Sequence, residues 1–177
     1  MKIIGITGKA RSGKDTLAEY LVEHHGFLKL SFAEPIRRFV SDITGHSVED
    51  LADGPLKEEN LGWIDTTPRR LMQTVGTEWG RQMVDPDLWL KVAHRRIRDA
   101  RRAGVPGIVI SDVRFNNEAE FVRRWDGEVI RIERPGVEAV AAHASEAGVS
   151  DDLVDLTIVN DRERRYLALW AADLAAE

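Results

Sequence analysis

The residues with the clearest chemical meaning lie in a short glycine-containing segment near the start of the chain. Residues 8–14 read Gly-Lys-Ala-Arg-Ser-Gly-Lys and match G-x-x-x-x-G-K, between an apolar run and an amphipathic one. Glycines let such a loop curl until its backbone N–H groups converge on phosphate oxygens, and the following helix adds partial positive charge. Lys14 supplies a mobile cation for the β- and γ-phosphates. The segment therefore predicts a nucleoside triphosphate site, rather than a glycine turn with a surface lysine.

The residue after this lysine departs from the usual pattern. Asp15 stands where the motif normally has the Ser or Thr whose hydroxyl binds Mg²⁺, and Thr16 follows it. Adjacent side chains on a helix are rotated by about 100°, so the two cannot point alike. Either the Asp15 carboxylate faces the metal, or Thr16 replaces the usual hydroxyl. We favour Thr16 on the metal side, with Asp15 near the metal or the acceptor, and the sequence leaves both open.

A second candidate group, Asp112 and Arg114, follows the apolar run 107–111. An acid at the carboxyl end of a parallel strand faces the crevice in which α/β sheets bind ligands. Asp112 could hold Mg²⁺ through water or accept a proton, but a phosphate acceptor is already ionised near neutral pH. We therefore expect a metal or positioning role for Asp112 and a bidentate grip on the acceptor phosphate for Arg114. The alternatives are a strand-end cap and a surface ion pair.

These residues need elements that bring them to one edge of a sheet. Five short apolar runs predict buried parallel strands, at residues 2–7, 28–32, 107–113, 128–133 and 153–159. Helical patterns lie between them: at 17–22, from Pro35, from Thr67-Pro68, from Asp85-Pro86 to Gly104, after Asn116 as a cap, and at 162–175. The alternation predicts a three-layer α/β fold around a five-stranded parallel sheet, without specifying the strand order.

Two stretches are longer than this alternation requires. We expect one domain with a core of residues 1–43, 106–134 and 153–177, a mainly helical insertion over about 44–105 and a polar excursion over about 135–152. Long insertions in an α/β core usually act as lids or substrate-binding parts, and simple decoration is the alternative. Phosphoryl transfer also needs many cations, and arginines lie near the strand ends and in the insertions. They are Arg37, Arg38, Arg70, Arg81, Arg131 and Arg134, and for any one of them a solvated or ion-paired surface position is the alternative to a substrate contact.

The composition excludes several classes of protein. The 177 residues carry a net charge of −5 and include no cysteine, which excludes disulfides, thiolate zinc sites and a cysteine nucleophile. An acidic chain is a poor candidate for sequence-independent nucleic-acid binding, so nucleic acid is not an expected partner. No apolar run approaches the roughly 18 residues of a membrane span, and Gly and Lys interrupt the first residues too early for a signal peptide. We expect a soluble cytoplasmic protein without a membrane partner.

Three other features have a plain structural explanation beside a functional one. The basic segment 91–102 is expected to be a solvated helix face rather than a nucleic-acid patch. Its aromatic residue, Trp89, lies at one end instead of between the basic residues. Trp63, Trp79 and Trp89 could stack a nucleobase, but we expect them to pack in the core of the insertion. Of the five histidines only His143 has a suggestive position, and no pair has metal-ligand spacing, so zinc is not expected.

Five segments together have the character of a known family. They are residues 5–16, 31–35 (Ser-Phe-Ala-Glu-Pro), 69–81, 110–115 (Ile-Ser-Asp-Val-Arg-Phe) and 143–146 (His-Ala-Ser-Glu). Over nearly its whole length the chain resembles the bacteriophage-type deoxynucleoside monophosphate kinases, within the P-loop nucleoside monophosphate kinase superfamily. Thr77-Glu78-Trp79-Gly80 is quite specific, and Asp15 is a family trait. The resemblance implies transfer of the ATP γ-phosphate to a deoxynucleoside monophosphate, with Mg²⁺.

The resemblance also implies a role for each matching position. The ATP-binding residues would be Gly8, Arg11, Ser12, Gly13, Lys14, Asp15, Thr16, Arg134 and Asn160. The acceptor-binding residues would be Arg37, Arg38, Arg70, Gln73, Glu78, Trp79 and Arg81. The catalytic residues would be Lys14, Asp112 and Arg114, and the metal-side residues Thr16, Asp15 and Asp112. Residues 135–152 would form a lid, and the accepted base is not predicted.

Three other functions stay open at this point. Animal-type phosphomevalonate kinases share a Ser-Gly-Lys-Asp loop and an Ile-Ser-Asp-x-Arg strand end with this chain. A nucleic-acid-stimulated P-loop ATPase would use the basic segment 91–102, and a nucleotide-binding regulator would bind ATP without turnover. A homodimer would fit the family, and a phage-encoded protein would act in the host cytoplasm.

Overall fold

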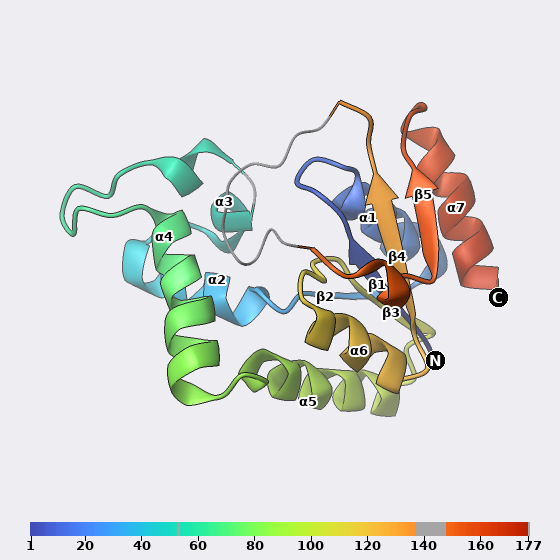
Figure 1. Ribbon diagram of the computed structural model, residues 1–177, viewed down its shortest axis with the longest axis horizontal. Coiled ribbons are helices and arrows are strands. Elements are labelled where there is room, and N and C mark those ends of the chain that lie inside the picture. Colours follow the sequence, from blue (N-terminus) through green and yellow to red (C-terminus); the bar gives the residue numbers. More distant parts are fainter. Residues whose placement is uncertain (53, 137–147, 177) are drawn as a thin grey trace. The chain divides into compact units, whose positions relative to one another are not determined.

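The sheet that the sequence predicts is present in the computed structural model, which describes residues 1–52, 54–136 and 148–176. Its strands are all parallel and run in the order β2-β3-β1-β4-β5 (Figure 1). They are β1 (Lys2–Thr7), β2 (Leu28–Leu30), β3 (Gly107–Ile110), β4 (Glu128–Glu133) and β5 (Leu156–Val159). All five predicted strands are confirmed, and three are shorter than predicted. Because β1 lies in the middle, the glycine-containing loop leaves the sheet at the centre of its carboxyl edge.

Helices cover both faces of this sheet and complete three layers. They are α1 (Lys14–His25), α6 (Asn116–Arg124) and α7 (Arg165–Ala176). Ile4 on β1 is fully buried in a cluster with Leu17 on α1 and Leu167 on α7. Gly5, the next residue, faces the opposite layer, because a Cβ there would lie 2.9 Å from Cγ2 of Val122 on α6. The alternation of strand side chains thus assigns α1 and α7 to one face and α6 to the other.

The start of α6 differs from the sequence prediction. Asn116 was expected to cap the helix, but it is the first helical residue, and its side chain exchanges hydrogen bonds with Ser150 at 2.8 and 2.9 Å. The buried Glu118 carboxylate caps the helix instead, accepting from the backbone N–H groups of Arg114 at 2.7 Å and Phe115 at 3.2 Å. This arrangement fixes the backbone just after the candidate residue Asp112.

The chain forms two compact units, residues 32–93 and the remainder. The helical unit contains α2 (Glu34–Thr44), α3 (Val48–Ala52), a 3₁₀ turn (Pro55–Glu58), α4 (Pro68–Gln73) and a π-helix (Thr74–Val84). α5 (Leu88–Arg102) begins in this unit and ends in the other, and a second 3₁₀ turn (Asp151–Leu153) precedes β5. The sequence placed the divisions near residues 44 and 105, and the function of each part stays a prediction.

Two glycines set the packing of the π-helix. A Cβ at Gly80 would lie 2.7 Å from the ring of Trp89, and one at Gly76 would lie 3.0 Å from Ile36. The indole N–H of Trp89 donates to the carbonyl of Gly76 at 2.8 Å. The periodicity of this stretch predicted a single amphipathic helix, and a π-helix of this length was not foreseen. The glycine face that meets Trp89 therefore leaves larger side chains on the outside of the helix.

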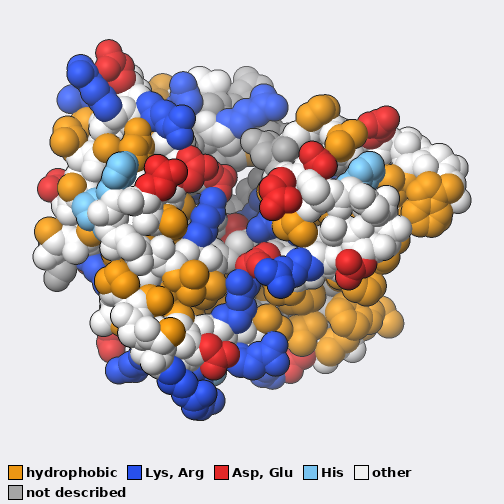
Figure 2. Space-filling view, turned by 180° about the vertical axis from the view of Figure 1, so that it is seen from behind, with side chains coloured by type: hydrophobic (Ala, Val, Ile, Leu, Met, Phe, Trp, Pro, Cys, Tyr) orange, Lys and Arg blue, Asp and Glu red, His pale blue; other side chains and the backbone are white. Residues whose placement is uncertain are grey.

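The tryptophan prediction holds for one residue of three. Trp89 is buried, but Trp79 is 48% and Trp63 62% exposed, so the expectation that they pack in a core is wrong for these two. Trp79 lies on the outer side of the π-helix because Gly76 and Gly80 occupy the inner side. Figure 2 shows hydrophobic side chains exposed among charged ones on one face of the molecule. In the described residues, no helix has the length and apolar character that crossing a membrane requires.

Candidate active site

The loop between β1 and α1 has a shape that only glycine allows at two points. Gly8 has a φ of +136°, and a Cβ there would lie 2.3 Å from the carbonyl oxygen of Ile132 on β4. Gly13 has a φ of +111°, and its Cβ would lie 2.6 Å from Nδ2 of Asn160. Both positions combine a left-handed backbone with close approach of a neighbour. The two glycines of the motif are thus required by the fold of the loop itself.

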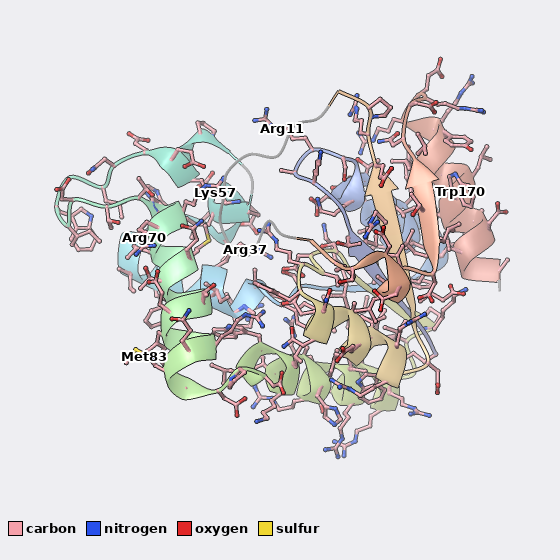
Figure 3. All side chains as sticks on the ribbon, viewed as in Figure 1. Arg11, Arg37, Lys57, Arg70, Met83 and Trp170 are labelled. Carbon is pink, nitrogen blue, oxygen red and sulfur yellow. The ribbon has the colours of Figure 1, made fainter. Side chains whose placement is uncertain are left out.

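The polar side chains of the loop differ in their surroundings. The Lys14 ammonium donates to the Lys9 carbonyl at 2.6 Å, within the loop. The Ser12 hydroxyl is buried and has no hydrogen-bond partner among the described residues. A buried hydroxyl without a partner is unusual in a folded protein, which agrees with the prediction that Ser12 belongs to a ligand-binding loop. Arg11 lies at the exposed tip of the loop with a φ of +62° (Figure 3).

Asn160 holds the loop from the end of β5. Its side chain is buried, and its amide donates to the Ser12 carbonyl at 2.8 Å across 148 residues of chain. Its backbone N–H donates to the Glu133 carbonyl at 2.7 Å. The resemblance implies that Asn160 binds ATP, and these contacts indicate that it also fixes the phosphate loop.

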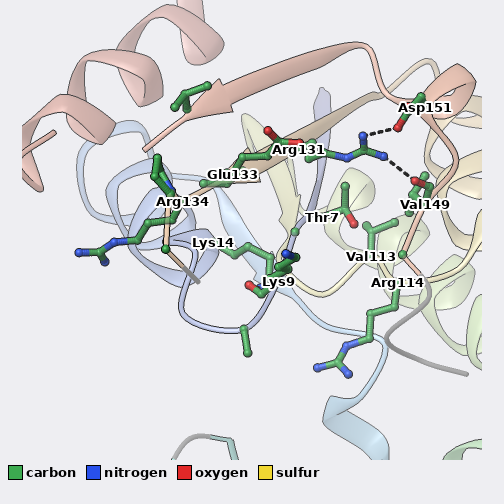
Figure 4. Close-up of a pocket in the computed structure, with 17 residues that line it drawn as sticks. Thr7, Lys9, Lys14, Val113, Arg114, Arg131, Glu133, Arg134, Val149 and Asp151 are labelled. Carbon is green, nitrogen blue, oxygen red and sulfur yellow. Dashed lines mark hydrogen bonds and ion pairs between the residues drawn. The ribbon is translucent and has the colours of Figure 1, made fainter. Parts of the chain in front are cut away.

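A cavity of about 660 Å³ opens beside the loop (Figure 4). This volume falls within the roughly 300–1,000 Å³ typical of small-molecule sites. The ionisable side chains that line it carry an excess of positive charge. They are Lys9, Lys14, Arg114, Arg131 and Arg134, with Glu133 and Asp151 as the acids. The cavity is thus suited in size and charge to a polyphosphate.

Arg131 lines the cavity and forms side-chain contacts with two residues just before β5. It lies on β4 beside Thr7 of β1, and its guanidinium bonds the Asp151 carboxylate and the Val149 carbonyl (Figure 4). These contacts tie the last residues of the polar excursion to the cavity wall. Residues 137–147, including the candidate His143, lie outside the described residues.

The second candidate acid contacts Ser31, which the sequence analysis quoted within the segment 31–35 but gave no role. Asp112 follows β3, and its Oδ2 accepts a hydrogen bond from the Ser31 hydroxyl at 2.6 Å. Asp15 behaves similarly, because its carboxylate pairs with the Lys29 ammonium at 2.9 Å. Lys29 and Ser31 alternate with Leu30 along β2 and its end. Two polar residues at this spacing within an apolar strand were the signal that could have identified them.

The residues present fit Mg²⁺ held chiefly by a nucleotide. Described residues include no cluster of three His, Asp or Glu side chains able to hold a metal ion alone. The candidate donors are the carboxylates of Asp112 and Asp15 and the hydroxyl of Thr16, all hard oxygen ligands. Mg²⁺ commonly takes one or two such ligands together with substrate phosphates and waters. The donor set therefore suits this ion beside a bound triphosphate.

The acceptor-side candidates all lie in the helical unit, residues 32–93. On α2, the exposed Arg38 pairs with Glu34 at 2.6 Å and Arg37 is half-buried. Arg70 of α4 pairs with Glu78 of the π-helix at 3.0 Å, and Arg70 points away from the helix axis in Figure 3. The remaining candidates range from half-buried to exposed; they are Gln73, Arg81 and Trp79. This unit thus presents arginines, a paired acid and an exposed indole.

Comparison with known proteins finds relatives along most of the chain. A sequence profile of the family described as Deoxynucleotide monophosphate kinase matches residues 2–65 and 55–168. A protein of Acanthamoeba polyphaga mimivirus, provisionally named deoxynucleotide monophosphate kinase, is 35% identical over 173 residues, covering 92% of this chain and 90% of that protein. The deoxynucleotide monophosphate kinase of Enterobacteria phage T4 is 22% identical over 224 residues, covering 91% and 93%. The solved dephospho-CoA kinase of Campylobacter jejuni shares the fold, with a TM-score of 0.54 at 16% identity over 100% of this chain and 97% of that one.

Proposed function

Because this chain belongs to the deoxynucleotide monophosphate kinase family, we propose that it transfers the γ-phosphoryl group of ATP to a deoxynucleoside monophosphate. The products are the deoxynucleoside diphosphate and ADP. The observation that carries the proposal is the glycine-shaped loop of residues 8–14 beside a cavity rich in Lys and Arg. Loop amides, a helix amino end and a lysine are the groups that hold transferable phosphates.

The mechanism needs little covalent help from the protein. Lys14 leaves the Lys9 carbonyl and, with the loop amides, holds the β- and γ-phosphates. Arg114 and Arg134 line the cavity and neutralise charge that develops on the phosphoryl group. An ionised acceptor phosphate attacks in line and needs no strong general base. Mg²⁺ would be held by the phosphates, by Asp112 and by Thr16 or Asp15, and it neutralises phosphate charge when bound.

The helical unit is proposed to bind the acceptor. Arg37 or Arg38 would hold its phosphate, since a guanidinium fork matches a phosphate bidentately. The exposed indole of Trp79 offers a face on which a nucleobase can stack. Residues 135–152 would close over the phosphates and exclude water, which prevents hydrolysis of ATP.

The proposed setting follows from these substrates. A kinase of nucleotides works where ATP, deoxynucleotides and Mg²⁺ are available, so we place it in the cytoplasm, of the host if the chain is phage-encoded. We also propose a homodimer, as the resemblance implies. Sedimentation of the purified protein at micromolar concentration would test this state directly.

One assay tests the proposed reaction. ADP release from Mg·ATP is followed in a coupled assay with dTMP, dGMP, dCMP, dAMP, the ribonucleotides and phosphomevalonate, each against a reaction without acceptor. We expect one or two deoxynucleotides to raise the rate far above the acceptor-free rate. A response to phosphomevalonate alone would identify the other kinase class. A rate that no acceptor raises would contradict the kinase proposal while leaving the ATP site in place.

A further inference from the structure

Strand β2 and the residue that follows it bring two polar side chains to the candidate acids Asp15 and Asp112. Lys29 pairs with Asp15 at 2.9 Å, and Ser31 donates to Asp112 at 2.6 Å. Side chains two residues apart along an extended segment project to the same face of a sheet. Lys29 on β2 and Ser31 just after it therefore contact the two candidate metal-side carboxylates, one each.

The contact between Ser31 and Asp112 is fixed by the backbone on both sides. Leu30 is in register with Ile110 of β3, and the Ser111 N–H donates to the Leu30 carbonyl at 3.3 Å. This bond extends the pairing of β2 and β3 by one step, to Ser31 and Ser111, and Asp112 is the next residue along the chain. The side chains of Ser31 and Asp112 are half-buried. A hydrogen bond between partly buried groups, held by paired strands, restricts the rotation of the carboxylate.

We propose that Ser31 is a positioning residue that orients the Asp112 carboxylate toward nucleotide-bound Mg²⁺. The inference rests on the proposed function, since it deepens the role of the same site. Ser31 touches neither substrate nor metal in this assignment and acts only through Asp112. Its hydroxyl engages Oδ2 and thereby fixes the plane of the carboxylate.

The chemistry of Mg²⁺ makes such an orientation consequential. This ion demands near-ideal octahedral geometry, so a carboxylate that rotates freely is a poorer ligand for it, directly or through water. Hydrogen bonds to the ligands of a metal typically change its affinity by about 10–100-fold when they are removed. Loss of the Ser31 hydroxyl should therefore weaken metal binding without altering the phosphate loop.

Binding of Mn²⁺, measured by electron paramagnetic resonance, tests the proposal. Mn²⁺ is titrated into the full chain saturated with a non-hydrolysable ATP analogue, for the wild type, Ser31→Ala, Ser31→Thr and Asp112→Asn. We expect the Mn²⁺ dissociation constant to rise about tenfold for Ser31→Ala and at least as much for Asp112→Asn. Ser31→Thr keeps the hydroxyl and should restore most of the affinity. Affinity for the metal-free analogue should not change.

Ser47 supplies a matched control. Its hydroxyl also donates to an aspartate carboxylate, that of Asp50, at 2.8 Å, but at the start of α3. Ser47→Ala should lower the melting temperature without changing the Mn²⁺ dissociation constant. The midpoint of Mg²⁺ activation in the kinase assay should shift for Ser31→Ala and not for Ser47→Ala.

The outcomes separate this inference from the proposed function. Wild-type Mn²⁺ affinity in Ser31→Ala, or failure of Ser31→Thr to restore a lost affinity, overturns the positioning role. An unchanged affinity in Asp112→Asn overturns it as well. An absence of kinase activity with every acceptor contradicts the proposed function instead, and the Mn²⁺ titration still reports on Ser31 because it needs no turnover.

Discussion

The phosphate loop and the helical unit hold their candidate functional groups in different ways. In the loop, the candidate groups are backbone amides together with Lys14, and buried neighbours fix the backbone. The Ile132 carbonyl leaves no room for a side chain at Gly8, and the Asn160 amide bonds the Ser12 carbonyl at 2.8 Å. In the helical unit, the candidates are side chains that pair with one another near the surface, as Arg70 does with Glu78 at 3.0 Å.

This difference suggests how each region should respond to change. A buried contact contributes to folding and to binding together, so its loss should alter both. An exposed ion pair contributes about 0–1 kcal/mol to stability, so its members are available for a ligand at little cost to folding. We therefore expect changes near the loop to affect stability and ATP binding, and changes in the helical unit to affect the acceptor alone.

Removal of the loop lysine should have the largest effect. Lys14→Ala deletes the cation that holds the β- and γ-phosphates, and we expect kcat to fall by about 10³-fold, the upper range for one charge-stabilising donor. Lys57 is a matched control in the helical unit, because its ammonium also donates to the carbonyl of the fifth residue before it, at 2.7 Å. Coupled ADP release should separate the two variants. Near-wild-type activity in Lys14→Ala would refute the mechanism.

Substitution of Asn160, which holds the phosphate loop, should have the second-largest effect. Asn160→Ala leaves the Ser12 carbonyl without its buried donor, which costs about 1–3 kcal/mol of unfolding free energy. We expect the KM for ATP to rise about tenfold and the KM for the acceptor to stay constant, since the loop loses its fixed shape. Asn116→Ala, which removes exposed bonds to Ser150, is the control. Urea unfolding and initial rates measure both effects, and an unchanged ATP KM would argue against this role of Asn160.

The contrast between the regions also explains what the sequence could predict. The loop was predictable because its motif is local and its shape depends on glycines within a few residues. The contact of Asn160 with Ser12 spans 148 residues and has no local signal. The π-helix likewise depends on a tertiary contact, since Gly80 lies against the Trp89 ring. The exposure of Trp79 follows from that packing, so periodicity alone placed it wrongly in a core.

Substitution of Arg70, in the exposed pair Arg70–Glu78, should weaken acceptor binding without lowering the stability of the fold. Arg70→Met removes the guanidinium that pairs with Glu78, and we expect an acceptor KM about tenfold higher, as for a lost charged contact of about 1.4 kcal/mol. The unfolding free energy should change by less than about 1 kcal/mol. Arg69→Met is the control, since the adjacent Arg69 pairs with Glu58. Equal acceptor KM values for the two variants would show that Arg70 does not bind the acceptor.

The smallest effect is expected from a surface pair that serves neither site. Lys91 bonds the Asp85 carboxylate, and this bond, with a weaker one from the Asp87 N–H, lowers the pKa of Asp85 below its usual value. The same contact raises the pKa of Lys91. The stability that Asp85 contributes is therefore present above about pH 4 and lost as pH falls through its lowered pKa. For Lys91 the contribution is present below about pH 10 and lost at higher pH.

Lys91 is exposed and Asp85 is partly exposed, so water screens the interaction and the free energy of unfolding near neutral pH should hardly change in Lys91→Met. The variant should instead raise the pKa of Asp85 part of the way to its usual value, because the Asp87 N–H still donates to it at 2.8 Å. A carboxyl titration followed by nuclear magnetic resonance measures this shift. An Asp85 pKa that does not move would show that the backbone donor, rather than Lys91, controls it. Such a result would assign the lowered pKa of Asp85 to a hydrogen bond within its own turn and leave the Lys91 ion pair without a measurable effect.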